Sequence, residues 1–559
     1  MKQKWVIKDK INKEDLNKFP EINPVILQLL YDRGLKTQAE IDEFLLPDYS
    51  QDIHDPFLFS DMQKVVKRIN RAKENNEKIV IYGDYDADGV CGTSILARLF
   101  KELDIQFDVY LPHRELEGYG LNEKAIIEIA KAKAKLIITV DCGISNVKEV
   151  DLANSLGLEV IITDHHGLPE VVPKAFGIIH SGLDTKYPFK YLAGGGVAFK
   201  LAQAFLKGTK YEILEKWLLD LVAISTVADM VPLIGENRTL VKYGLIVLSK
   251  TKNLGLQKLI EITGINIDKI DTFTIGYQIA PRINAAGRMA HANNAYQLLT
   301  TDNIEEAITI AHSLNKSNTE RQSLTDKIVM EVLEQIGSVK KESVLYAKGS
   351  DWPAGLIGLV ASKIVRQYFR PVLIFSEVDN LLVASARSIE EFNLIEALNE
   401  LKDYFVKYGG HKGAAGFSME PNKYEDFKKE FTKLVKKKLK DIELLPRIDI
   451  DLEIKLNEIN WPIIELLLSF EPYGQGNLRP KFRINDLKIV NLETVGNDQK
   501  HLRLILSDGE LERKVIAFGF GECNQELELG QKIDIICEIS INQWNGNKEI
   551  QLSLIDFKV

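Results

Sequence analysis

The chain has 559 residues, of which 45% are hydrophobic and 27% charged, with a formal net charge of −9 at pH 7. This length exceeds one ordinary core, so three or four domains with the composition of a soluble globular protein are expected. The acidic balance excludes a surface coated in positive charge for nucleic acid, although local basic clefts remain compatible with it. No apolar run is long enough to span a bilayer, and no apolar signal region follows the charged start.

The cysteine content indicates a reducing environment. The four cysteines lack the clustered spacing of a zinc site or of a disulfide framework, and they are Cys91, Cys142, Cys523 and Cys537. The cytoplasm therefore fits this sequence best.

The pattern of apolar residues divides the chain into five predicted segments. Residues 1–60 form a helical segment interrupted by prolines, and residues 61–290 alternate strands with helices, which predicts an α/β domain with a parallel sheet. Residues 291–340 contain a long connecting helix, because apolar residues recur there at helical spacing without a proline. Residues 341–445 form a second α/β domain. Residues 446–559 contain about five short alternating strands, typical of a small β-barrel of the oligonucleotide/oligosaccharide-binding (OB) kind.

The predicted barrel offers a surface on which the bases of a single strand can stack. The candidate stacking residues are aromatic, although each type is more often found in a core, and they are Phe482, Phe518, Phe520 and Trp544.

Polar groups follow three apolar runs of the first α/β domain, at the point where each run ends. Residues 78–82 lead into an aspartate-rich loop, residues 136–140 lead into Asp141, and residues 160–163 lead into Asp164 and two histidines. Runs of this length and β-branched content are typical of buried parallel strands, whose carboxyl ends meet at the edge where open α/β sheets bind ligands. The groups expected to converge there are Asp84, Asp86, Asp88, Asp141, Asp164, His165 and His166.

Five carboxylates and two imidazoles in one small volume require bound cations or protons to neutralise their charge. Oxygen-rich ligation with imidazole suits Mn²⁺ or Mg²⁺. Zinc is disfavoured because no thiolate set is available. A shared Asp141 bridging two ions at about 3.5–4 Å predicts two-metal phosphoester hydrolysis. Each aspartate taken singly is also compatible with a helix cap or a turn.

Asp229 is a further candidate, because it follows another run of small and apolar residues, 223–228. The same residue is equally compatible with a cap or a turn.

The order of these motifs resembles the DHH phosphoesterase superfamily. The motifs are Asp-Tyr-Asp-Ala-Asp-Gly, Asp-Cys-Gly, Asp-His-His and Ala-Asp-Met-Val-Pro. The glycine-rich segment 408–417 is similar to the associated second domain of that superfamily, and segment 281–288 together with the barrel is similar to its single-stranded-DNA exonucleases. The resemblance covers nearly all of the chain beyond the first 60 residues.

The resemblance implies a set of metal ligands, namely Asp84, Asp86, Asp88, Asp141, His165 and Asp229. It places His166 beside the scissile phosphate, as a donor to it or as an acid. We therefore expect Asp88, Asp141 and His166 to be catalytic, with Mn²⁺ or Mg²⁺ as the cofactor.

One position departs from the family pattern. Members usually have Asn-Pro after the fifth strand, where this chain has His180-Ser181. His180 either takes over a positioning role or is a lone histidine on a loop, and the sequence favours the second interpretation.

Several residues are expected to hold the DNA strand. Arg114 follows a predicted strand, Tyr119 lies between two glycines, and the resemblance implies phosphate binding by the first and nucleotide orientation by the second. Arg282, Asn284 and Arg288 belong to a turn whose small residues allow close approach to a polyanion.

A second group is expected to bind a terminal phosphate. Ser385 and Arg387 follow a strand and present hydroxyl and guanidinium donors, as in the pocket that related exonucleases use for the 5′ end. Gly410 and His411 lie in a glycine-rich segment whose N–H groups can form an anion-binding nest, although such a segment is also compatible with a simple tight turn.

These features predict a metal-dependent 5′→3′ exonuclease on single-stranded DNA that releases 5′-mononucleotides in DNA repair and recombination. One alternative is a phosphodiesterase for small substrates such as nanoRNA or cyclic dinucleotides, for which the barrel is superfluous. Another is a non-catalytic single-strand-binding scaffold, in which metal ligands should be missing. The resemblance further implies single-stranded-DNA-binding protein and a RecQ-type helicase as partners. We also expect a monomer, and no membrane association because no apolar run spans a bilayer.

Overall fold

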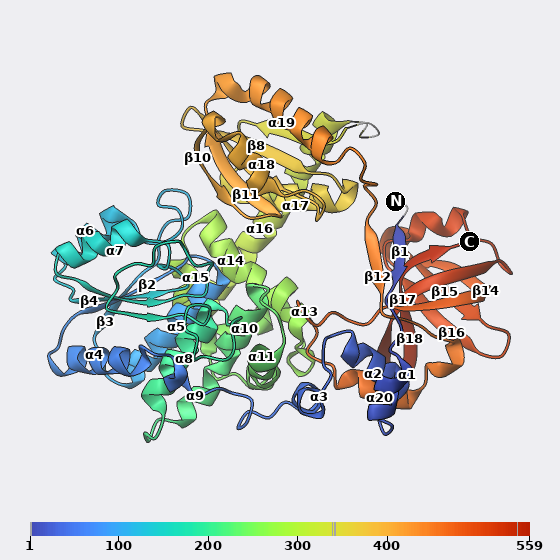
Figure 1. Ribbon diagram of the computed structural model, residues 1–559, viewed down its shortest axis with the longest axis horizontal. Helices are drawn as coiled ribbons and strands as arrows, with labels where there is room; N and C mark the ends of the chain where they lie inside the picture. Colours follow the sequence, from blue (N-terminus) through green and yellow to red (C-terminus); the bar gives the residue numbers. More distant parts are fainter. Residues whose placement is uncertain (1–2, 338, 340–341, 545) are drawn as a thin grey trace. The chain divides into compact units, whose positions relative to one another are not determined.

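The computed structural model describes residues 3–337, 339, 342–544 and 546–559. The chain divides into two compact units (Figure 1). The larger unit contains His54–Asp229 and Gly244–Leu445, and the smaller unit contains Met1–Ile53, Met230–Tyr243 and Pro446–Val559. Among the described residues, no helix has both the length and the apolar character needed to cross a membrane.

The larger unit begins with a five-stranded parallel sheet in the order β3-β2-β4-β5-β6. Its strands are β2 (Ile79–Gly83), β3 (Phe107–Tyr110), β4 (Leu136–Val140), β5 (Glu159–Thr163) and β6 (Gly177–Ile179). β2 and β4 are buried along their whole length, because helices cover both faces of the sheet. This confirms the predicted α/β class.

The two faces of this sheet contact different helices. Val80 and Tyr82 of β2 pack with Ile126 of α6 and Val150 of α7, while α4, α5 and α8 lie on the other side (Figure 1). These helices are α4 (Met62–Glu74), α5 (Ala87–Glu102), α6 (Glu123–Lys131), α7 (Val147–Ser155) and α8 (Gly194–Leu206).

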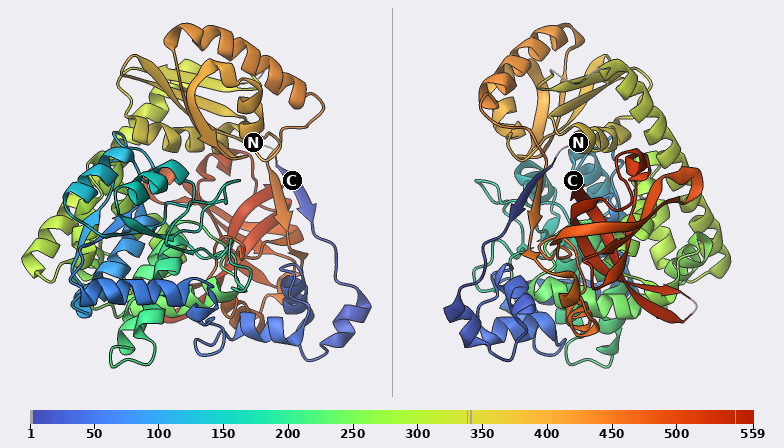
Figure 2. Two further views of the ribbon diagram at one scale, coloured as in Figure 1. Left: turned by 60° about the vertical axis from the view of Figure 1, so that its left-hand side comes forward. Right: turned by 90° about the vertical axis from the view of Figure 1, so that its right-hand side faces the viewer.

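A helical layer follows the sheet. Its members are α9 (Ile213–Trp217), α10 (Leu219–Ala228), α11 (Gly235–Leu248), α12 (Leu254–Thr263), α13 (Thr272–Thr274), a π-helical turn (Ile275–Ile279), α14 (Ala280–Met289), α15 (Asn293–Thr300) and α16 (Ile304–Ile336). The 33-residue α16, seen along its length in the right-hand view of Figure 2, is the predicted connecting helix. Residues 338 and 340, at the end of the expected connecting segment, lie outside the described residues.

The second sheet of the larger unit is mixed, in the order β10-β11-β9-β8-β7, with only β7 and β8 parallel. Its strands are β7 (Leu345–Gly349), β8 (Val372–Val378), β9 (Leu381–Arg387), β10 (Phe405–Gly410) and β11 (Ala414–Met419). Its helices are α17 (Ala354–Tyr368), α18 (Leu394–Glu400) and α19 (Tyr424–Lys438). The predicted second α/β domain thus has a sheet of its own.

The smaller unit contains a closed five-stranded barrel, because β14 pairs with β17 as well as with β15. The barrel strands are β14 (Phe482–Val495), β15 (His501–Ser507), β16 (Glu512–Ala517), β17 (Lys532–Trp544) and β18 (Asn547–Lys558), and β13 (Leu452–Glu453) adds to β14. Phe482 is buried in the barrel core, whereas Phe518 is 63% exposed and Phe520 packs partly against the core. The side chain of Trp544 lies outside the described residues.

The sequence predicted a purely helical N-terminal segment, and this prediction was wrong. The segment contains α1 (Lys13–Lys18), α2 (Pro24–Tyr31) and α3 (Gln38–Leu45), but it begins with a strand, β1 (Lys4–Ile7). β1 pairs in parallel with β12 (Arg447–Ile450), and Trp5 donates a 2.7 Å hydrogen bond from Nε1 to Asp556. Four residues whose partner lies more than 400 positions away carry no local strand signal, which explains the error. The last helix of this unit is α20 (Trp461–Leu468).

Candidate active site

Strand register brings the predicted polar groups to one edge of the parallel sheet. Gly83 of β2 is aligned with Val140 of β4, and Val140 is aligned with Thr163 of β5. The residues that follow these three strand ends, Asp84, Asp141 and Asp164, are therefore neighbours, and all three are buried. Asp141 has φ +62°, a left-handed backbone that aspartate tolerates better than most residues do.

The loop after β2 places two more aspartates at the start of α5. Asp86 is its N-cap, with Oδ1 accepting hydrogen bonds from the N–H groups of Asp88 and Gly89 at 2.9 and 3.1 Å. Asp88 lies in the first turn and is 1% exposed. Its two oxygens accept from the N–H groups of Gly194 and Gly195 at 2.7 and 2.8 Å, so Asp88 caps α8 from another helix.

The glycines at the start of α8 were not among the predicted site residues. A Cβ on Gly194 would lie 2.5 Å from the Cβ of Asp141, and a Cβ on Gly195 would lie 2.4 Å from the hydroxyl of Ser225. That hydroxyl donates a 2.5 Å hydrogen bond to Asp88. The run of three glycines, 194–196, was the available signal, because such a run permits a close backbone approach.

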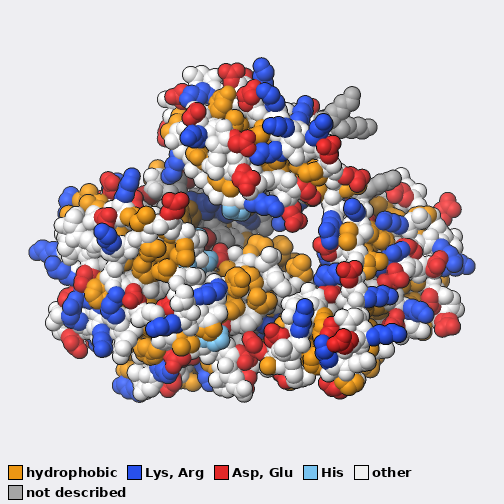
Figure 3. All heavy atoms as spheres, in the orientation of Figure 1, with side chains coloured by type: hydrophobic (Ala, Val, Ile, Leu, Met, Phe, Trp, Pro, Cys, Tyr) orange, Lys and Arg blue, Asp and Glu red, His pale blue; other side chains and the backbone are white. Residues whose placement is uncertain are grey.

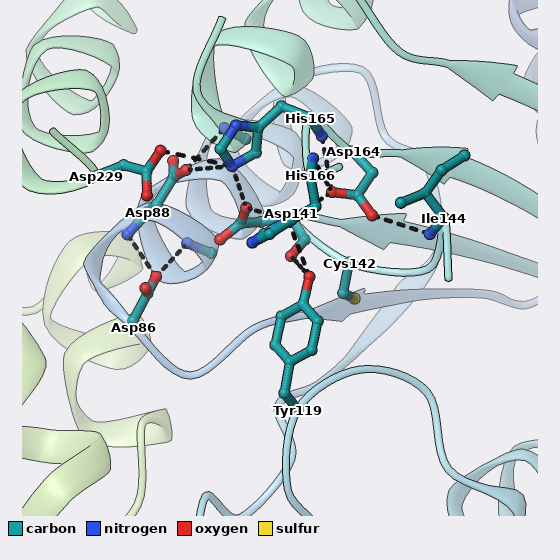
Figure 4. A network of polar contacts seen from close by, with 12 residues as sticks. Asp86, Asp88, Tyr119, Asp141, Cys142, Ile144, Asp164, His165, His166 and Asp229 are labelled. Carbon is teal, nitrogen blue, oxygen red and sulfur yellow. Dashed lines mark hydrogen bonds and ion pairs between the residues drawn. The ribbon is translucent and has the colours of Figure 1, made fainter. Parts of the chain in front are cut away.

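The imidazole of His165 is the centre of the cluster (Figure 4). Its Nε2 atom lies 3.1 Å from Asp141 Oδ1, 3.5 Å from Asp229 Oδ2 and 3.6 Å from Asp88 Oδ2. Asp229 is the C-cap residue of α10, Asp88 lies in the first turn of α5 and Asp141 follows β4, so two helices and one strand bring carboxylates to one nitrogen.

The electrostatics of this cluster fit bound cations. Burial and the negative charge of Asp86 raise the pKa of Asp84. Burial and the negative charge of Asp88 likewise raise the pKa of Asp141, and they raise that of Asp229 to about 8. Burial also lowers the pKa of His165, which keeps its imidazole neutral and able to act as a ligand.

Three buried atoms that face this cluster have no hydrogen-bond partner among the described residues, and they are Asp84 Oδ1, Asp141 Oδ1 and His165 Nε2. Buried polar atoms of this kind require a partner, and a divalent cation supplies one.

The candidate ligand atoms form three triads, and Asp141 belongs to two of them. Asp84, Asp86 and Asp141 lie within 4.8 Å of one another, as do Asp141, His165 and His166, and a third triad consists of Asp88, His165 and Asp229. One side is rich in carboxylates and the other contains imidazole, which fits two cations of the Mn²⁺ or Mg²⁺ type.

Asp164 orients the histidines. Its Oδ1 accepts from the N–H groups of His165 and His166 and lies 2.8 Å from His166 Nδ1, while Oδ2 accepts from the N–H of Ile144 at 2.9 Å. Burial opposes both charges, but this contact holds the pKa of Asp164 below its usual value and raises that of His166 to about 9. His166 is therefore a cationic donor with a partly exposed ring.

Tyr119 completes this arrangement. Its hydroxyl donates to the carbonyl of Asp141 at 3.1 Å and lies 2.9 Å from His166 Nδ1. Its ring is 46% exposed, with its centroid 5.1 Å from that of His166, so a nucleotide can contact it beside the histidine.

His180 is not the lone loop histidine that the sequence favoured. It is 2% exposed, directly after β6. Its Nδ1 accepts from the N–H groups of Gly182 and Leu183 at 3.0 and 3.1 Å, so Nε2 carries the proton and donates to the carbonyl of His166 at 2.8 Å. No sequence pattern indicates this role, because the carbonyl belongs to the backbone of a residue 14 positions earlier.

The predicted phosphate-binding arginines gather near the acidic cluster. Arg114 lies over the ring of Tyr85, 4.8 Å from its centroid, and Arg288 donates to the carbonyl of Gly355 at 2.8 Å. Burial, reinforced by Arg114, lowers the pKa of Arg288 to about 10 and also lowers that of Arg387. Among the described residues, these three guanidinium groups form no ion pair, which leaves them available to an anion.

The 281–288 segment lies within α14 and does not form the predicted turn, and two of its residues bond to the protein itself. Arg282 donates to the carbonyl of Gln278 and to the side chain of Asn315, at 2.5 and 3.0 Å. Asn284 accepts a 2.9 Å hydrogen bond from the N–H of Ala87, at the start of α5, so it supports the metal loop.

The second sheet contributes Ser385 and Arg387. Arg387 donates to the hydroxyls of Ser362 and Ser385, both at 3.2 Å. A Cβ on Gly358 of α17 would lie 3.0 Å from both Ser385 Oγ and Arg387 Nη2. The sequence analysis missed this glycine, whose isolated position in a helix is a packing signal.

Gly410 is the last residue of β10, and His411 opens the tight turn that leads to β11. Gly410 has φ +150°, and the N–H of His411 donates to the carbonyl of Ala414 at 2.8 Å. The N–H of Gly413 donates to His411 Nδ1 at 3.3 Å. The N–H groups of His411 and Gly413 are thus used within the turn, while Nδ1 accepts a hydrogen bond and the imidazole Nε2 can act as a donor.

Comparisons with known proteins agree with this architecture. The model of the DHH family, N-terminal domain, matches residues 78–226, that of the DHHA1 domain matches residues 341–437, and that of the RecJ OB domain matches residues 450–556.

Curated relatives match this chain over nearly its whole length. The chain is 36% identical to the single-stranded-DNA-specific exonuclease RecJ of Bacillus subtilis over 100% of this chain and 71% of that protein, and 31% identical to RecJ of Haemophilus influenzae over 96% of each. The crystal structure of Thermus thermophilus RecJ in complex with Mn²⁺ superposes with a TM-score of 0.85 at 27% identity, covering 100% of this chain and 79% of that one, and a Mg²⁺ complex also matches. The chain therefore belongs to the RecJ family of single-stranded-DNA-specific exonucleases.

Proposed function

We propose that this protein removes 5′-mononucleotides from the 5′ end of single-stranded DNA, using two divalent cations. The observation that carries the proposal is the convergence of three carboxylates on His165 Nε2, beside arginines that form no ion pair. Carboxylates and a neutral imidazole hold cations, and unpaired guanidinium groups bind phosphate.

The ligand set divides between two sites. Asp84 and Asp86 would hold one cation, and Asp88, His165 and Asp229 would hold the other. Asp141 lies near both sets and would serve both cations. When bound, Mn²⁺ or Mg²⁺ lowers the pKa of a water and polarises the scissile phosphate.

The remaining groups position the strand. His166, kept cationic by Asp164, donates a hydrogen bond to a phosphate oxygen from its free Nε2. Tyr119 contacts the nucleotide beside it. Arg114, Arg288 and Arg387 bind the terminal phosphate.

The hydrolytic role is tested with Asp141→Ala, assayed on end-labelled single-stranded DNA in Mn²⁺. We expect a loss of activity of at least a thousandfold, because the residue shared by both ligand groups is gone. Asp151→Ala, an exposed aspartate of α7, is the matched control and should remain fully active. Wild-type activity in Asp141→Ala would end the proposal.

The direction of digestion is tested separately, with the label at either end of the strand. Digestion from the 5′ end releases a 5′ label at once as a mononucleotide, whereas a 3′ label stays on shrinking fragments. Immediate release of the 3′ label would reverse the polarity proposed here.

The biological setting follows from this activity. We propose that the enzyme is a cytoplasmic monomer in DNA repair and recombination, supplied with single strands by a RecQ-type helicase and by single-stranded-DNA-binding protein. The relatives' specificity for single-stranded DNA supports this. Sedimentation tests the monomer, and digestion of strands coated with the binding protein tests that partner.

A further inference from the structure

Two aromatic side chains form an exposed stacked pair at the start of the helical run that leads into α14. Phe273 and Tyr277 have their ring centroids 4.6 Å apart and their planes inclined by 25°. They are 57% and 63% exposed. In the space-filling view of Figure 3, apolar side chains gather in the area of α13. Apart from this mutual contact, no aromatic ring and no cation of the described residues lies over either side chain.

This pair is not an extension of the core. Ile275 and Ile279, on the other side of the same run, are fully buried. Gly276 faces α10, because a Cβ built on it would lie 3.8 Å from Val227. The run is therefore anchored by its apolar side, while the two rings stay outside. Contiguous exposed apolar surface of this kind marks interaction sites.

The run connects the pair to the active site. Val227 lies two residues before Asp229, and seven residues after Tyr277 the side chain of Asn284 bonds to the metal loop. Seven helical residues span about 10 Å. Stacked nucleotides rise by about 3.4 Å each, so this distance corresponds to roughly three nucleotides.

We infer that Phe273 and Tyr277 form a stacking platform for nucleobases about three nucleotides from the scissile phosphate. The inference rests on the proposed exonuclease function, which supplies the strand. The platform takes any base, because every base has a π-face.

The charges around the platform favour contact with bases rather than with phosphates. The N-cap of the run is Asp271, whose Oδ1 accepts from the N–H of Thr274 at 2.8 Å. A carboxylate at this place repels phosphate. The platform therefore adds affinity without adding a phosphate contact, and its loss should leave the salt dependence of strand binding unchanged.

The test combines Phe273→Ala with Tyr277→Ala and compares a 5′-phosphorylated dinucleotide with a long single strand. The dinucleotide is too short to reach the platform. We expect the ratio of kcat/KM for the long strand to kcat/KM for the dinucleotide to fall about tenfold to a hundredfold, as the loss of base stacking predicts. Phe273→Tyr with Tyr277→Phe keeps both rings and should keep the ratio, as should Met330→Ala, which removes an exposed apolar side chain of α16.

A second measurement ties the effect to the bases themselves. Abasic sites at the third and fourth nucleotides from the cleaved end should lower kcat/KM of the wild type for the long strand as much as the double alanine substitution does. The same abasic sites should not change kcat/KM of the double alanine variant. Equal losses in both proteins, or an unchanged ratio in the variant, would overturn the platform. A wild type that cleaves neither substrate would instead refute the exonuclease proposal.

Discussion

His180 shows how one buried side chain can position the reacting groups. Its neutral imidazole accepts two N–H groups of its own loop and donates to the carbonyl of His166. The adjacent His165 is the central ligand of the proposed metal site. His180 thus fixes the backbone from which both histidines project.

His180→Ala should lower kcat about tenfold to a hundredfold and lower the free energy of unfolding by about 1–3 kcal/mol, because buried backbone groups lose their partners. His180→Asn should restore much of the activity, since an amide also donates and accepts. Steady-state kinetics across Mn²⁺ concentrations and urea unfolding measure both effects. An alanine variant with wild-type kcat would show that His180 does not position the site.

The raised carboxyl pKa values predict how stability depends on pH without metal. Asp229 titrates at about 8 in the folded protein and near 3.8 in an unfolded chain, so the folded state holds protons that the unfolded state has released. In EDTA, the free energy of unfolding should therefore decrease as the pH rises from about 4 to about 8. Saturating Mn²⁺ should largely remove this decrease, because cations replace the protons. Denaturant titrations at several pH values measure it, and a metal-free stability that rises with pH would contradict the account.

At the scale of elements, the start of α8 depends on glycine. Gly194→Ala would place a methyl group 2.5 Å from the Cβ of Asp141, so either α8 or the metal ligand must move. We expect at least a hundredfold loss of activity together with weaker Mn²⁺ binding. Gly196→Ala is the matched control, since its Cβ would meet Leu192 at an ordinary 3.5 Å. It should stay active, and equal activity of both variants would mean that the close approach is unimportant.

The elements that the sequence predicted correctly have a local signal. β2, β4 and β5 are unbroken apolar runs because both of their faces are buried, and parallel strands necessarily bring their ends to one edge. β1 has no such signal, since its partner β12 lies at the other end of the chain. The capping of α8 by Asp88 was equally invisible, because a contact between two helices leaves no periodic pattern.

At the scale of the whole molecule, three distant segments of the chain make up the smaller unit. Arg238 joins them. It is 1% exposed and donates to five carbonyl oxygens, those of Phe44, Ser469, Phe470, Glu471 and Pro472. The sequence gives no hint of this, because an arginine in a helix usually faces solvent.

Arg238→Met should destabilise the smaller unit by about 3 kcal/mol or more, since several buried carbonyls lose their donor. Differential scanning calorimetry should show an early transition for this variant, while the dinucleotide is still hydrolysed by the larger unit. Arg479→Met, which removes a partly exposed arginine of the same unit, is the control. A single unshifted transition in Arg238→Met would contradict this role.

The central claim is that aspartates and a histidine from distant parts of the chain together hold divalent cations. Isothermal titration of the metal-free protein with Mn²⁺ tests it most directly. The account predicts two bound ions for each wild-type chain and loss of both in Asp141→Ala, whose carboxylate the two sites share. Mn²⁺ binding by Asp141→Ala with wild-type stoichiometry and affinity would contradict it.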